Sequence, residues 1–490
     1  MRTYVLGGET RRRALFNGVS RGQVVSIIMG VLAWLVVMMI TRSVWALLGG
    51  VVLALVATGA GRRRTALGES WAGSVYDRLA FRFSGKGAPD FVPGQTLPRE
   101  VGDIRVLAYA PPVARKSPMA IVHHKDNRRA SWNTGHLTAT FEIQGSGDGL
   151  LPASQVDTAG LRFERLLGGL ASAEIPVDQL DICTRVLPVH PDAYRDHMAG
   201  LVVPTAPERL KASMAELAGF AAGNAEEYRS FATIRVPLAH LQASVGTQMD
   251  LDDLCAHTFD LVGDVVRRVD SAGYRLRAVL GPRRLGALIR HLHDPDHDMD
   301  NLDGIGSVAD GWGQVRHKAK DWTRVEGTGR DWYHAVAHVP RDGWPSQAVT
   351  ARFMETLVTQ VSPATIRTVV SQFRLVPKVQ ARQMARMGLT YDVATKRGAE
   401  KKQQISTGET EASMSAARRT LQDLMQPVTG GVYPAIRVMV SAPDPALLAA
   451  ARKRVVGAAE NGGVTRLDWE TYQHHKALVT ALPMARGVRA

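Results

Sequence analysis

The sequence predicts a membrane-anchored α+β protein, in which a two-helix transmembrane hairpin precedes an internally duplicated βαβαβαβ α/β-sandwich region with a projecting helical hairpin. Two uncharged apolar runs near the amino terminus, each long enough to cross a bilayer, predict the hairpin. The remaining chain shows strand and helix periodicity twice in the same order, which predicts the duplication. A chain of 490 residues has room for two or three domains.

The two apolar runs are residues 22–41 and 43–61, with only Arg42 between them. A cleavable signal peptide and a buried soluble hairpin are the alternatives, but a second run follows at once and arginines flank both ends. Because positive residues stay on the cytoplasmic side, we expect a two-pass protein of the cell membrane with both termini cytoplasmic, and a basic cytoplasmic tail over residues 1–21. The orienting residues are Arg11, Arg12, Arg13, Arg21, Arg42, Arg62, Arg63 and Arg64.

A juxtamembrane amphipathic helix is expected over residues 62–84. Apolar residues recur there every four positions, which favours a helix lying on anionic lipid, although packing on the next domain is an alternative. That face consists of Trp71, Val75, Leu79 and Phe83. Prolines then predict a linker over residues 85–118, with one short strand at 104–108.

Two α+β domains follow, over residues 119–280 and 331–490, with a connector at 281–330. We expect each domain to be one sheet with helices covering one face. The first has strands at 136–143, 180–187, 231–239 and 274–280, and helices at 157–173, 206–227 and 251–272. The second has strands at 331–339, 365–375, 433–441 and 463–469, and helices at 346–360, 378–425 and 444–460.

The net charge of +14 is concentrated in two segments, since residues 1–86 contribute +9 and residues 378–402 contribute +5. The rest of the chain is neutral, so nucleic acid is not expected as a partner. The helical arm 378–425 begins with this basic segment, which we expect to contact a partner, with a solvated helix as the alternative. The contact residues would be Arg382, Arg386, Lys396, Arg397, Lys401 and Lys402.

Motifs for catalysis are absent from the sequence. No phosphate-binding loop, dinucleotide loop, G-x-S-x-G or H-E-x-x-H occurs, so we expect no enzyme, no cofactor and no catalytic, cofactor-binding or metal residues. Two cysteines, Cys183 and Cys255, exclude a disulfide scaffold. The polar cluster His291–Asp300 fits a helix end with a turn, and whether it binds a metal stays open.

Three segments carry a resemblance to a known family: residues 61–83, Ile289–Pro295 (IRHLHDP) and Ala477–Gly487 (ALVTALPMARG). With the hairpin, they make the chain resemble actinobacterial membrane proteins of type IV secretion or conjugation-like clusters. The hairpin is similar to the PrgI-type subunit, and the remainder is similar to the amino-terminal, non-ATPase half of TraC-type conjugation ATPases. The layout is also similar to that of EccE of type VII secretion.

This resemblance implies a non-enzymatic inner-membrane scaffold subunit of a type IV-like secretion or conjugation apparatus. It would contact the lipid bilayer and dock a separate cytoplasmic ATPase and other membrane subunits of the same apparatus, with homo-oligomerisation left open. An EccE-like stabilising subunit of a type VII complex is one alternative. A membrane-attached enzyme of unknown reaction is another, and Asp294-Pro295-Asp296 is its one candidate D-x-D motif.

Overall fold

The structure is a computed structural model, and the chain divides into two compact units, Gly8–Lys86 and the remainder. Every helix and strand described below belongs to the larger unit. The described residues are 103–110, 118–125, 134–145, 152–189, 200–222, 226–245, 250–340, 343–345, 349–350, 352–401 and 430–486, with the isolated positions 34, 39, 82, 415, 418, 421 and 422.

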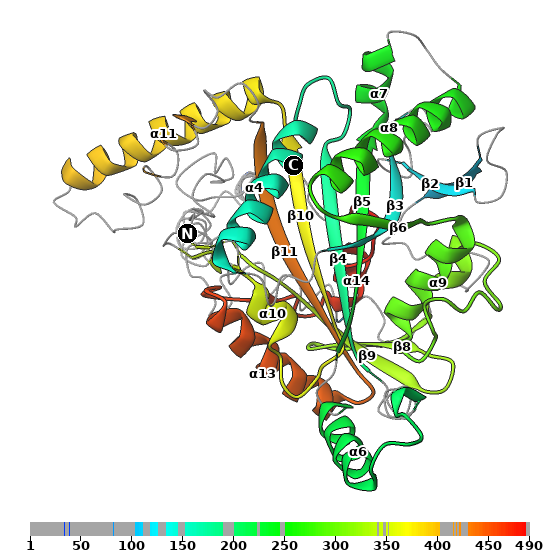
Figure 1. Ribbon diagram of the computed structural model, residues 1–490. Helices are drawn as coiled ribbons and strands as arrows, with labels where there is room; N and C mark the ends of the chain where they lie inside the picture. The colour runs from blue at the N-terminus through cyan, green and yellow to red at the C-terminus, as the bar shows by residue number, and fades with distance from the viewer. Residues whose placement is uncertain are drawn as a thin grey trace. The chain divides into compact units, whose positions relative to one another are not determined.

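These residues form one 12-stranded sheet, in which every strand pair is antiparallel (Figure 1). The strand order is β1-β2-β3-β5-β4-β10-β11-β9-β8-β7, with β6 paired to β3 and β12 paired to β9. The strands are β1 (Ile104–Tyr109), β2 (Met119–His124), β3 (His136–Gln144), β4 (Gln179–Pro188), β5 (Glu226–Pro237), β6 (Arg275–Val279), β7 (Val315–Lys318), β8 (Thr323–Glu326), β9 (Asp331–His338), β10 (Arg367–Val376), β11 (Gly431–Ala442) and β12 (Asp468–Trp469).

The strand order reads the same from both ends. Strands β1 to β6 of the first half (Ile104–His293) correspond in order to β7 to β12 of the second half (Val315–Thr480). Apart from its leading hairpin, each half has the β-α-β-β-α-β order of a ferredoxin-like unit. The halves meet edge to edge where β4 pairs antiparallel with β10, from Gln179↔Arg374 to Val186↔Arg367. This pairing removes one exposed edge from each half, so two small sheets become one.

The helices cover both faces of the sheet, and those of the two halves correspond in chain order. They are α4 (Ala153–Leu170), α6 (Glu208–Ala222), α7 (Leu238–Val245), α8 (Leu251–Ser271), α9 (Pro282–His293), α10 (Glu355–Thr359), α11 (Lys378–Lys401), α13 (Pro445–Asn461) and α14 (His474–Thr480). In this order, α4 corresponds to α10, α8 to α13 and α9 to α14. Helices α6 and α11 occupy the same place, between the second and third strands of each half's β-α-β-β-α-β unit.

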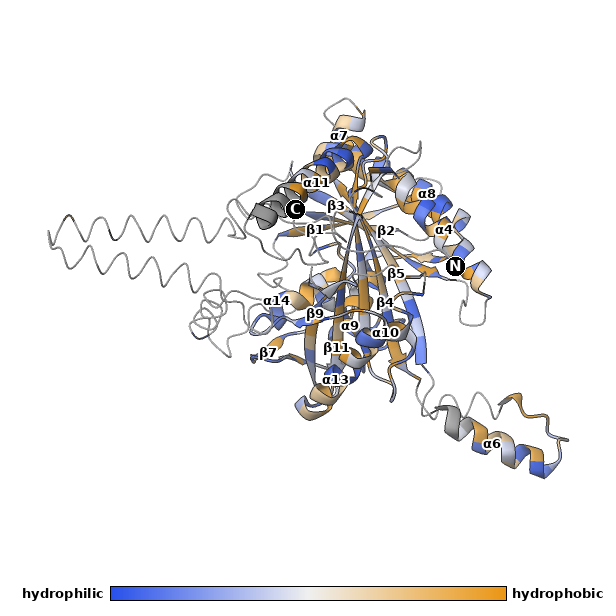
Figure 2. Cartoon of the chain, turned by 90° about the vertical axis from the view of Figure 1, so that its left-hand side faces the viewer, coloured by the Kyte–Doolittle hydropathy of each residue, from blue (hydrophilic) through white to orange (hydrophobic). Residues whose placement is uncertain are grey.

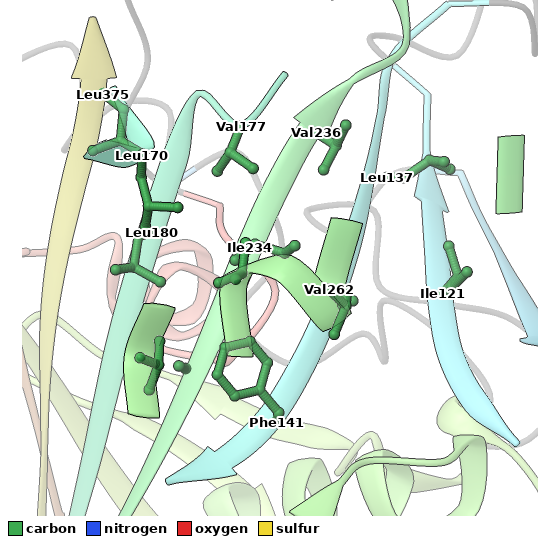
Figure 3. Packing of buried hydrophobic residues seen from close by; sticks show 14 of the residues in the cluster. Ile121, Leu137, Phe141, Leu170, Val177, Leu180, Ile234, Val236, Val262 and Leu375 are labelled. Atoms are coloured by element: carbon green, nitrogen blue, oxygen red, sulfur yellow. The ribbon is translucent and has the colours of Figure 1, made fainter. Parts of the chain in front are cut away.

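One face of the sheet packs against α4, α7 and α8 in the first half and against α10 and α13 in the second, and is called the α4/α13 face below. Alternate strand residues such as Leu137, Phe141 and Ile234 point to this face and are fully buried (Figure 3). Aspartates cap two of its helices: Asp250 accepts from the backbone N–H of Asp253 in α8, and Asp444 caps α13 in the same way.

The opposite face packs against α9, α14 and residues 481–486, and is called the α9/α14 face below. Its apolar core joins Trp312, which is 1% exposed, to Val370 and Met439 at the centre of the sheet. Because neighbouring strand residues point to opposite sides, Val369 lies in the α4/α13 core while Val370 lies here. The two faces therefore share every strand but bury different residues.

A buried ion pair ties the two halves together beside the junction. Arg367 of β10 donates from Nη1 and Nη2 to the two carboxylate oxygens of Glu226 in β5, at 2.6 and 2.8 Å. The same guanidinium donates to the backbone carbonyls of Leu357, Val358 and Thr365. The side chains of Arg367 and Glu226 are 0% and 6% exposed, so this charge pair is removed from solvent and fully bonded.

The expected fold class is wrong in its connectivity. The sequence predicted two separate βαβαβαβ sheets, each with helices on one face, whereas the structure has one antiparallel sheet covered on both faces. The difference is clearest at α6 and α11, which the expected βαβαβαβ order treats as ordinary connections between successive strands. Instead, β4 pairs with β5 and β10 with β11 as antiparallel neighbours, so each helix is inserted into a hairpin.

The membrane-anchored part of the prediction is corrected as well. Among the described residues, no helix is both long and apolar enough to cross a bilayer. The expected hairpin over 22–61 lies outside the described residues except for Trp34 and Met39. The transmembrane hairpin, the two-pass topology and the cell-membrane location therefore have no support in the structure.

Candidate functional site

A row of buried and half-buried polar side chains crosses the junction between the halves on the α9/α14 face. They come from neighbouring strands at positions that face the same side: Gln179 pairs with Arg235, and Asp181 pairs with Thr233 on one side and Gln372 on the other. We call this row the polar seam, and it consists of His124, His136, Thr138, Thr140, Gln179, Asp181, Thr233, Arg235, Gln372, Arg437 and Arg486.

Asp181 lies at the centre of the polar seam and is 1% exposed. Its two carboxylate oxygens accept from Nε2 of Gln179 at 2.8 Å and from Nε2 of Gln372 at 3.1 Å. Burial raises the pKa of this carboxyl to about 7, and the two amide donors only partly offset that rise. The amide oxygens are themselves held by arginines, since Arg235 donates to Gln179 and Arg437 donates to Gln372.

The segment after α14 closes over the seam. The hydroxyl of Thr140 donates to the carbonyl oxygen of Pro483 at 3.0 Å, and Gln372 donates to the carbonyl oxygen of Arg486 at 3.1 Å. The guanidinium of Arg486 then contacts Nδ1 of His124 at 3.0 to 3.2 Å. Strand β3, strand β10 and the carboxyl-terminal segment are thus joined through side chains of both halves.

Two stacked histidines form the outer end of the seam. The rings of His124 and His136 lie 4.6 Å apart and nearly parallel, and Nε2 of His124 bonds to the hydroxyl of Thr138 at 3.0 Å. Burial lowers the pKa of both imidazoles, that of His136 to about 2, and the nearby arginines lower it further. Gly135 makes this geometry possible, because it adopts a φ of 103° and a Cβ there would collide with the carbonyl of His124.

A second buried polar group lies farther along the junction, around Arg185 of β4. Its guanidinium is fully buried, donates to the hydroxyl of Thr368 at 2.9 Å and approaches Nε2 of His291 at 3.4 Å. Burial lowers the pKa of Arg185 to about 9, and Nη2 has no hydrogen-bond partner among the described residues. Burial and Arg185 together lower the pKa of His291 to about 3, so this imidazole is neutral.

The polar cluster His291–Asp300 is divided among separate partners. His291 bonds to the carbonyl of His297, while Asp294 accepts from the backbone and hydroxyl of Thr328. The remaining carboxylates are held elsewhere: Asp296 binds Arg330 and Trp332, and Asp300 binds Arg229 and Arg284. Within the part of the chain that the structure describes, no group of three possible ligands is placed to hold a metal ion.

The buried thiols and the carboxyl of Asp181 lie in the closed interior of the fold. Burial raises the pKa of Cys183 to about 12 and that of Cys255 to about 11, so neither thiol is activated as a nucleophile. Asp181 can exchange a proton near neutrality, but strands and the carboxyl-terminal segment enclose it. The polar seam therefore joins the two halves through hydrogen bonds, and partner contacts must be sought on the surface.

The predicted contact residues lie on α11, which begins directly after β10. Arg382 is half-buried and Arg386 is exposed. The same helix also contains Lys396, Arg397 and Lys401. Lys402 lies outside the described residues. So do all the predicted membrane-orienting arginines and the juxtamembrane residues Trp71, Val75, Leu79 and Phe83.

Helix α11 is attached to the sheet by small residues. Ala381 and Ala385 are each 1% exposed, and Gly431 at the start of β11 approaches Ala381 so closely that a side chain there would collide with it. The opposite side of the helix is open: Val379 is 80% exposed and Met387 is 46% exposed, with Arg386 beside them. The first turns of α11 thus present apolar and basic side chains together.

No family model matches the chain, and no curated protein matches it with significant similarity. The resemblance to proteins of type IV secretion clusters therefore remains a prediction.

Sequence reasoning missed the polar seam and Arg185. A signal for both was present in β4, where Asp181 and Arg185 interrupt an otherwise apolar run, LDICTRVL. Charged residues inside a strand that is buried on both faces require partners. Gln372, 191 residues from Asp181, and Thr368, 183 residues from Arg185, supply them, and nothing in the sequence alone pairs β4 with β10.

Proposed function

We propose that this protein is a non-enzymatic docking subunit of a type IV-like secretion or conjugation apparatus, in which α11 binds a separate ATPase. The observation that carries the proposal is the exposed basic and apolar side of α11, a helix whose first turn packs on the sheet at Ala381. The duplicated sheet would act as the platform that holds this helix in place. The apparatus itself is inferred from the resemblance of the sequence.

The composition of α11 supports a protein partner with an acidic surface. The helix contains six basic and two acidic residues. Complementary charge accelerates association and selects the partner, while exposed side chains such as Val379 and Met387 supply apolar area that binding would bury.

The rest of the described surface supports docking over catalysis. Within the described residues, Asp181 and Arg185 have strongly shifted pKa values, and both lie inside the polar seam and the Arg185 cluster, which the fold encloses. An active site needs such groups in contact with substrate. No specific observation favours an EccE-like subunit of type VII secretion or an enzyme.

The test is capture of a secretion ATPase from detergent extracts of the native cells by the tagged full-length chain. The double substitution Arg382→Glu and Arg386→Glu should reduce capture at least about tenfold, and capture by the unaltered chain should weaken with salt. The matched control reverses two other exposed charges, Lys453 on α13 and Arg275 on β6, and should leave capture unchanged. Equal capture by both variants would refute the role of α11, and capture of no apparatus component would refute the proposed function.

A further inference from the structure

Helix α6 is the counterpart of α11 in the first half, but its surface has a different character. Leu210 is 63% exposed and Leu217 is 60% exposed, and in the segment before the helix Leu201 and Val203 are each 61% exposed. Figure 2 shows hydrophobic and hydrophilic residues interleaved along α6. A 15-residue helix with so much apolar surface in water is marginal by itself, so it calls for a partner.

The apolar residues of α6 form one stripe. Leu210, Met214 and Leu217 are spaced by four and three residues, which places them on one side of a helix with 3.6 residues per turn. The stripe is centred near Met214, with a leucine at nearly equal distance on each side. Two copies of such a helix can therefore pack antiparallel, with Leu210 of one against Leu217 of the other and the two Met214 residues meeting at the twofold axis.

The charges of α6 select this antiparallel self-pairing. Arg209 and Glu216 are seven residues apart, so they lie on the same flank of the stripe, and both are exposed. A twofold axis perpendicular to two antiparallel helices brings each flank against the same flank of the other copy. Arg209 of one helix then lies beside Glu216 of the other, and the pair occurs twice. In a parallel pair with the same stripe, this flank would not meet itself.

We infer that α6 is a self-association element, and that its occupant is α6 of a second copy of this chain. The inference is independent of the proposed function of α11, because it concerns a different helix and a different partner. The contact is small: a 15-residue helix is about 22 Å long, and a standard interface buries about 800 Å² on each partner. We therefore expect a weak dimer, with a dissociation constant of about micromolar order.

Charge exchange provides the decisive test, with sedimentation equilibrium of the purified full-length chain as the readout. Arg209→Glu alone and Glu216→Arg alone should each weaken dimerisation about tenfold, because each places like charges opposite one another. The double variant Arg209→Glu with Glu216→Arg should restore it. Leu217→Glu should abolish the dimer. A chain that is monomeric at all concentrations, or a double variant no better than the singles, overturns the inference.

Cross-linking tests the register without relying on the strength of association. Met214→Cys should form a disulfide between two copies under mild oxidation, since this position lies on the predicted twofold axis. Ala212→Cys, on the far side of the same helix, is the matched control and should not. The native Cys183 and Cys255 are buried and leave the background low. Equal cross-linking at both positions would show that the pairing is not the one inferred.

Discussion

The two faces of the sheet use the same strands but are built from different chemistry. The α4/α13 face buries mostly aliphatic and aromatic side chains under helices that come from both halves. The α9/α14 face combines an apolar core with the polar seam and the Arg185 cluster. Apolar burial depends on area and tolerates adjustment, whereas buried hydrogen bonds require defined partners. Buried hydrogen bonds join the halves on both faces, through the Arg367–Glu226 pair beside α10 on the α4/α13 face and through the more extended polar seam on the α9/α14 face.

The largest expected effect lies on the α4/α13 face. Phe141→Ala should lower the free energy of unfolding by about 3–5 kcal/mol, because this ring is fully buried among aliphatic side chains and its removal leaves a cavity. The loss should be the same at pH 5 and pH 8 in urea unfolding, since the ring packs in an apolar core. Leu447→Ala, at a half-exposed position of α13, is the control and should cost less than about 1 kcal/mol.

A pH-dependent effect is expected on the α9/α14 face at Asp181. Its pKa is about 7 in the folded chain against 3.8 for an unperturbed aspartate, so between these values the folded state holds a proton that the unfolded state has lost. Asp181 therefore destabilises the fold increasingly as pH rises through this window. The free energy of unfolding of Asp181→Asn, relative to that of the unaltered chain, should therefore rise by about 3 kcal/mol as the pH rises from 4 to 7.

Asp260→Asn on α8 is the matched control for that measurement, because Asp260 is exposed on the other side of the sheet. The difference between the control and the unaltered chain should be flat with pH. The histidines act in the opposite direction. Burial lowers the pKa of His291, His293 and His334 to about 3 to 4. As the pH falls below about 6.5, these histidines take up protons in the unfolded state first, so the folded state becomes less stable. A parallel pH profile for Asp181→Asn and the unaltered chain would contradict the role assigned to this carboxyl.

The smallest expected effect is the loss of stability when the hydroxyl of Thr140 is removed and the size of the side chain is kept. Thr140→Val keeps the volume but removes the donor to Pro483 and the bond to Thr233, so it should cost about 1–3 kcal/mol. Thr158→Val on α4 removes an exposed hydroxyl that bonds within its own helix, and it should change stability by less than about 0.5 kcal/mol. Thermal or urea unfolding of the two variants measures the contrast, and equal losses would show that the seam contributes no more than a surface bond.

Local structure was largely predictable from the sequence. The strand expected at 331–339 is β9 (Asp331–His338), and the helix expected at 251–272 is α8 (Leu251–Ser271). Alternating apolar residues in one case and a capped amphipathic run in the other carry the signal within a few residues of chain. The helix expected at 346–360 is shorter, since α10 covers only Glu355–Thr359. The residues 281–330, expected as a connector, contain α9, β7 and β8.

The sequence by itself determined most of the strand and helix segments, where the basic charge lies and which common catalytic motifs are missing, because these depend on residues close together in the chain. Only the tertiary structure decided that β4 pairs with β10, that α6 and α11 interrupt hairpins, and that Asp181 meets Gln372. Pairing of strands nearly 190 residues apart depends on which edges and buried polar groups complement each other in space. No local pattern records that choice, and the polar seam exists only because of it.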